Sequence, residues 1–69
     1  MIWFIGNRML SDAAREAVIY YQDRGLEAVR FLVSQREWAA RGIRGSLAGL
    51  PVAPSTAIPF GVLFVYVKE

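Results

Sequence analysis

Few residues in this chain could do chemistry. The 69-residue sequence has no His and no Cys, which removes the commonest general base, the thiol nucleophile, disulfides and the usual zinc ligands. Among the carboxylates, only Asp12 and Glu16 share a predicted helix face one turn apart, a spacing that can divide acid and base roles. Because that face is polar and exposed, we interpret both as partners of the helix dipole. We therefore expect no enzyme, no metal and no cofactor.

A candidate anion site lies at Asn7 and Arg8. The segment Gly6-Asn7-Arg8 follows an apolar run and precedes a predicted helix start, where free backbone amides attract anions. A tight turn between a strand and a helix also requires Gly and Asn, so a purely structural turn is the alternative.

Arg41 and Arg44, flanked by glycines, form a small basic patch. Such a patch could contact an acidic protein surface or a nucleic-acid backbone, and the alternative is solvated loop charge. The acidic residues are interleaved with the basic ones and the net charge is only +2. We therefore do not expect nucleic acid to be the partner.

Ile19 and Tyr20 are the best candidates for apolar contact residues. At 100° per residue, Ile19 lies within the polar face of the predicted helix. Tyr20 follows it and belongs to a residue type that dominates interface energetics. Together with Arg41 and Arg44, they form the predicted partner-binding set.

The elements that position these residues are predicted in the order β-α-β-α-loop-β. Apolar runs at 2–5, 28–33 and 61–67 favour strands, and those at 2–5 and 61–67 are apolar on both faces, so both faces should be covered. The first helix should begin at Ser11 or Asp12 and end at Arg24-Gly25-Leu26. Its buried face should carry Leu10, Ala13, Ala14, Ala17, Val18, Tyr20 and Tyr21.

A capping box, Ser34-Gln35-Arg36-Glu37, opens the second helix, which should end at Arg41-Gly42-Ile43. Residues 42–59 hold all three prolines and are predicted to be one long loop. The chain should thus be a single small α/β domain over residues 1–69, with a single-layer sheet of about three strands and two helices. The alternative is one long helix from Ser11 to Arg41 that contains Gly25.

The order of elements resembles the thioredoxin and glutaredoxin fold. The segments 39–45 and Ala57-Ile58-Pro59-Phe60 are similar to those before and at the cis-proline of that family. The family's paired cysteines would fall near 7–10, where this chain has Asn, Arg, Met and Leu. The resemblance therefore implies a shared fold without redox chemistry, and a cis bond before Pro59 as its signature.

Small size and high apolar content point to a partner. A domain of this length buries only about 60% of its unfolded surface. The chain has 55% hydrophobic residues and no cysteine for a disulfide. We therefore expect it to form a homodimer or to dock on another protein. Neither terminal apolar run fits a signal peptide or a membrane span, so we expect a cytoplasmic protein.

These features predict a non-enzymatic protein–protein interaction module, a small homodimeric inhibitor or adaptor that occludes or bridges a partner protein. In type it resembles small phage-encoded proteins that inhibit a host factor. Two alternatives stay open: a subunit of a larger structural assembly, and a nucleic-acid-binding module that uses Arg8, Arg41 and Arg44.

Overall fold

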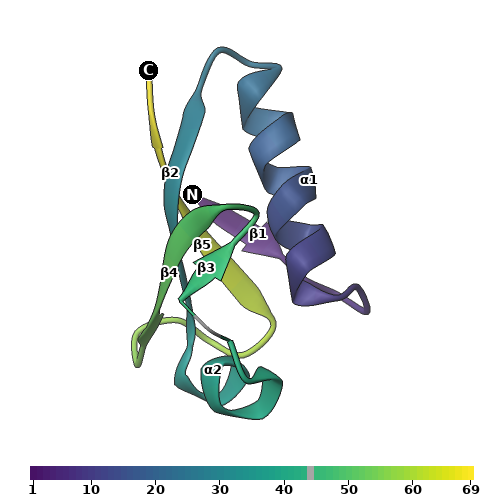
Figure 1. Cartoon of the computed structure of the whole chain (residues 1–69), viewed down its shortest axis with the longest axis vertical. Helices are drawn as coiled ribbons and strands as arrows, with labels where there is room; N and C mark the ends of the chain where they lie inside the picture. The colour runs from purple at the N-terminus through teal and green to yellow at the C-terminus, as the bar shows by residue number, and fades with distance from the viewer. Residues whose placement is uncertain (44) are drawn as a thin grey trace.

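The computed structural model describes residues 1–43 and 45–69, which form seven elements (Figure 1). In chain order these are β1 (Ile2–Phe4), α1 (Leu10–Gln22), β2 (Glu27–Ser34), α2 (Gln35–Arg41), β3 (Ser46–Leu47), β4 (Leu50–Ser55) and β5 (Val62–Lys68). No helix within the described ranges is long and apolar enough to cross a membrane.

The strands form one mixed sheet in the order β1-β5-β2-β4-β3. Only β2 and β4 pair in parallel, and the other neighbours are antiparallel. Helix α1 lies along one side of the sheet, whereas the short α2 lies near one end of the strands (Figure 1). The α/β class with two helices is confirmed, but the predicted strand number is wrong, since the sheet has five strands rather than three.

Two of the extra strands, β3 and β4, lie inside the predicted loop 42–59. They form a hairpin whose two connecting residues, Ala48 and Gly49, have φ of 51° and 78°, as a tight turn between twisted strands requires. Prolines are normally excluded from central strands because they lack an N–H. Here Val52 donates toward the β3 side, to Gly45 O. The backbone nitrogen of Pro54, two residues further along β4, points to the same side as that of Val52. It lies beyond the end of β3, so no ladder hydrogen bond is required there.

Helix α1 ends as predicted but begins earlier. Its N-cap is Met9, which has no capping side chain, so the prediction that Ser11 or Asp12 caps the helix is wrong. At the other end, Leu26 N–H donates to Tyr21 O at 2.9 Å, and Gly25 has a φ of +79°. This is the glycine stop expected from the sequence, and it excludes a single helix from Ser11 to Arg41.

Helix α2 begins at the predicted capping residue, yet only half of the capping box forms. Ser34 Oγ accepts the Glu37 N–H at 3.0 Å. The Glu37 carboxylate does not return to the Ser34 amide, as the full motif would require. Instead its Oε1 accepts the Gly61 N–H at 2.9 Å and its Oε2 accepts from Arg41 Nε. Glu37 is fully buried, so it ties α2 to the turn that precedes β5.

The core lies between α1 and one face of the sheet. The helix contributes mostly alanines, which let its backbone approach the sheet closely; its buried residues are Leu10, Ala13, Ala14, Ala17 and Tyr21. The sheet contributes the fully buried Phe31, Val33, Leu63 and Val65. Trp3 packs at the border, with its ring centroid 5.1 Å from that of Tyr20 and 5.9 Å from that of Tyr21. The predicted helix face is therefore confirmed except at Val18, which is partly buried, and at Tyr20, which is exposed.

The cis bond expected before Pro59 is wrong, because the described part of the chain contains no cis peptide bond. The two additional strands between α2 and β5 also depart from the element order on which the thioredoxin resemblance was based.

Replacing Glu37 should destabilise the fold. Glu37→Ala removes two charge-assisted hydrogen bonds and leaves the Gly61 N–H without its acceptor, so we expect the free energy of unfolding to fall by about 3 kcal/mol. Urea denaturation followed by circular dichroism measures this loss. Gln35→Ala, at an exposed position of the same helix, serves as control and should change stability by less than about 0.5 kcal/mol. Equal effects of the two variants would contradict the role of Glu37.

Candidate docking face

The sheet face opposite α1 carries a continuous row of apolar side chains. Side chains directly opposite each other in neighbouring strands point to the same face. Ile2 is opposite Phe64, Phe64 is opposite Leu32, and Leu32 is opposite Ala53. The row therefore crosses four strands, β1, β5, β2 and β4, at a single level.

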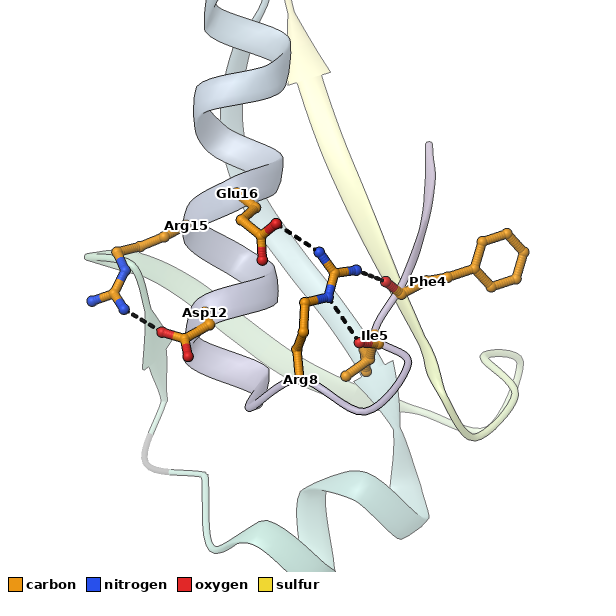
Figure 2. Close-up of polar contacts among 6 residues, drawn as sticks. All are labelled: Phe4, Ile5, Arg8, Asp12, Arg15 and Glu16. Atoms are coloured by element: carbon orange, nitrogen blue, oxygen red, sulfur yellow. Dashed lines mark hydrogen bonds and ion pairs between the residues drawn. The ribbon is translucent and has the colours of Figure 1, made fainter.

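Further side chains extend this row along the strands. Phe4 lies on the same face of β1 as Ile2, and Tyr66 lies on the same face of β5 as Phe64, because side chains two residues apart share a face. In Figure 2 the Phe4 ring points away from α1. We call this surface the open sheet face; it comprises Ile2, Phe4, Arg30, Leu32, Ala53, Phe64 and Tyr66.

The open sheet face is exposed at β1 and at Tyr66, whereas Leu32, Ala53 and Phe64 are half-buried and Val62, which is opposite Phe4, is buried. Phe4 is 70% exposed, Ile2 60% and Tyr66 40%, and neither described helix lies over them (Figure 1). Isolated exposed apolar residues are normal, but a contiguous apolar patch on a monomer marks an interaction surface. The chain's own helices therefore do not supply the cover that the sequence predicts for both faces of strands 2–5 and 61–67.

One arginine stacks on an aromatic ring of this face, and a second stacks on a ring in the turn before β5. The Arg30 guanidinium carbon lies 4.7 Å from the ring centroid of Tyr66, which it opposes across β2 and β5. The Arg36 guanidinium carbon lies 5.1 Å from the ring centroid of Phe60, in the turn before β5. Among the described residues, neither arginine has a carboxylate partner. At the other end of the face, Lys68 pairs with Glu27 at 3.4 Å.

No family model, no curated protein and no solved structure matches this chain. The interpretation of the open sheet face therefore depends on its geometry and charge alone.

The candidate anion site at Asn7 and Arg8 is occupied by the protein's own groups (Figure 2). Arg8 donates through Nε to Ile5 O at 3.1 Å and through Nη2 to Phe4 O. Its Nη1 lies 2.8 Å from Glu16 Oε1. Arg8 thus joins the end of β1 to α1, and an anion would have to compete with Glu16. Anion binding there stays a prediction.

The two arginines of the predicted basic patch have different positions. Arg41 pairs with the buried Glu37 and contributes to holding α2 in place. Arg44 lies outside the described residues. The contact role predicted for both remains a prediction.

Ile19 and Tyr20 both lie exposed on α1, with exposed fractions of 57% and 40%. Ile19 is thus on the solvent side of the helix, as its place in the polar face indicated. Tyr20 packs against Trp3 and holds the Arg24 guanidinium carbon 3.6 Å from its ring centroid. Their role in contact with another molecule is a prediction that the fold leaves untested.

Sequence reasoning missed the open sheet face, although a signal for it was present. The alternate positions Val62, Phe64 and Tyr66 are apolar like Leu63, Val65 and Val67 between them. With only one long helix in the chain, one of the two faces had to stay without a helix.

Phe4 and Ile5 should respond very differently to a polar substitution. Phe4 is 70% exposed and Ile5 is fully buried, so Phe4→Ser should change the free energy of unfolding by less than about 1 kcal/mol. Ile5→Ser should cost about 3 kcal/mol or more, because it removes buried apolar volume and buries a hydroxyl. Urea denaturation of both variants makes the comparison. A large loss in Phe4→Ser would show that Phe4 packs in the core rather than on an open face.

Stability should also fall at alkaline pH through Tyr21. Burial, and secondly the neighbouring Tyr20, raise the pKa of the Tyr21 hydroxyl above its ordinary value of 10.0. A raised folded-state pKa means that stability is fully present below about pH 10 and is lost as pH rises through the folded pKa. Tyr21→Phe should flatten this loss, as measured by urea denaturation between pH 8 and pH 11. An equal loss in the variant would contradict the assignment.

Proposed function

We propose that this chain is a non-enzymatic protein–protein interaction module, an inhibitor or adaptor that occludes or bridges a partner protein. The observation that supports this function best is the open sheet face. Removing apolar surface from water contributes about 25 cal/mol per Å², so a partner that covers Phe4, Ile2 and Tyr66 gains affinity from side chains that add little to folding. The cytoplasmic location and the phage-type inhibitor role belong to the same proposal.

The sheet architecture supports the same function. A mainly antiparallel sheet that leaves one face to solvent normally has polar side chains on that face, whereas the alternate positions of β5 are apolar on both faces. Here α1 covers one face only (Figure 1). A partner that docks on the other face would complete a three-layer arrangement with the sheet in the middle.

Self-association is the second part of the proposal and uses a different surface. Ile19 and Tyr20 lie on α1, on the side of the sheet opposite to Phe4 and Tyr66. A homodimer formed through α1 would leave the open sheet face of each copy free. Such a dimer could bridge two partner molecules.

Single-stranded nucleic acid is the second candidate partner, because exposed aromatic side chains on a sheet can stack with bases. The aliphatic Ile2, Leu32 and Ala53 beside the aromatic residues favour a protein partner. A protein that contacts few phosphates also binds nucleic acid weakly at physiological salt.

Ile19→Asp should weaken self-association without unfolding the chain, because Ile19 is 57% exposed and a charge in a dimer interface is costly to desolvate. Sedimentation equilibrium should show a dimer for the wild type and at least a tenfold weaker dimer for the variant. The melting temperature of the wild type should rise with concentration. Ser11→Asp, an exposed position of the same helix, is the control. A monomeric wild type would remove the homodimer from the proposal.

A further inference from the structure

We infer that the partner segment bound by the open sheet face is an amphipathic helix whose apolar stripe is flanked by Asp or Glu side chains. The inference depends on the proposed function and goes beyond it by naming the chemistry of the partner.

The charges at the face point to an acidic partner. Of the described cations, Arg8, Arg15, Arg41 and Lys68 each pair with a carboxylate. Arg24, Arg30 and Arg36 do not. Arg24 lies over Tyr20 on α1 and Arg36 over Phe60 in the turn before β5, whereas Arg30 lies over Tyr66 on the open sheet face itself. Glu27, the acidic residue opposite Lys68 at the end of β2, is already paired. The face therefore combines an apolar centre with positive charge that has no counterpart within the described residues.

The stacked arginines are suited to bind carboxylates. A guanidinium that lies over an aromatic ring is held in position by cation–π attraction. Its N–H donors, which lie in the guanidinium plane, stay available for bidentate hydrogen bonds to a carboxylate. Arg30 would thus contact an acidic side chain beside the apolar stripe that covers Tyr66 and Phe64.

The dimensions of the face fit a helix. The apolar row crosses four strands, and neighbouring strands lie about 4.8 Å apart, so the row is about 14 Å long. A helix with its side chains is about 10–12 Å wide. On the opposite face, α1 covers the same sheet with 13 residues. A partner helix of similar length would cover the open sheet face as α1 covers the opposite face.

A second copy of the chain fits this face less well. Face-to-face association would bring the Arg30 guanidinium groups of both copies into one interface, and the carboxylate at this face, that of Glu27, is already paired with Lys68. Like charges brought together in an interface cost several kcal/mol. The charge pattern therefore favours a different, acidic protein.

Two synthetic peptides of about 14 residues test the inference. They share one helical Leu stripe, and one has Glu at the flanking positions where the other has Lys. Fluorescence anisotropy with the full chain should give at least a tenfold lower Kd for the Glu peptide, and a weaker affinity at high salt, where charge pairs are screened. An oligothymidylate of similar length is the third probe.

Substitutions on the face identify the residues that bind. Phe4→Asp should weaken binding of the Glu peptide at least tenfold, because it places a carboxylate in the apolar contact. Arg30→Glu should reverse the preference, so that the Lys peptide binds more tightly. Met9→Asp and Arg15→Glu, at exposed positions away from this face, are matched controls that should leave both affinities unchanged. Circular dichroism confirms that each variant is folded.

The outcomes separate this inference from the proposed function. If both peptides bind equally well and Phe4→Asp abolishes binding, the face binds protein but the acidic partner is wrong. If neither peptide binds, both this inference and the role of the face in the proposed function fail. If the chain binds oligothymidylate and Phe4→Asp loses this binding, the inference is overturned in favour of nucleic acid. If the wild type is a dimer and Phe4→Asp is a monomer, it is overturned in favour of a second copy of the chain.

Discussion

A sheet has two faces, and this chain has one long helix with which to cover them. Helix α1 lies along one side of the five-stranded sheet, and the seven-residue α2 lies near one end of the strands. The core is therefore one-sided, with Phe31, Leu63 and Val65 buried beneath the helix. The open sheet face follows from this imbalance, because the strands are apolar on the uncovered side as well. The exposed aromatic side chains are a consequence of the architecture rather than scattered surface residues.

Two charged side chains hold the ends of this half-covered sheet in place. Glu37 is buried and accepts hydrogen bonds from Gly61 and Arg41, which fixes α2 against the turn before β5. Arg8 bonds to the carbonyls at the end of β1 and to Glu16 on α1. A buried carboxylate is stable only when it is fully paired. Glu37 and Arg8 therefore both have a structural role at the ends of the sheet.

Local signals in the sequence predicted the local structure well. The stop at Gly25, the cap at Ser34 and the amphipathic face of α1 each depend on residues within one or two turns of each other. Strand β4 was missed because Pro51 and Pro54 argue against a strand. Pro54 is acceptable because β3 is too short to reach it, and Pro51 because it lies outside the register in which β4 pairs with β2. The open sheet face was missed for a related reason. Which face a helix covers depends on how distant segments pack, and no single segment encodes it.

The bond from Arg8 to the Phe4 carbonyl has a further consequence for solubility. Met1 bonds to Val65 in β5 and Ile5 to Gly61 just before β5, so the Phe4 carbonyl, on the alternate side of β1, points to the outer edge of the sheet. An unprotected edge strand with Ile2 and Phe4 on it is a template for adding strands from other molecules, and thus for fibrous aggregation. The Arg8 side chain occupies that carbonyl and places a charge at the edge. This charge opposes the addition of a strand from another molecule beside β1.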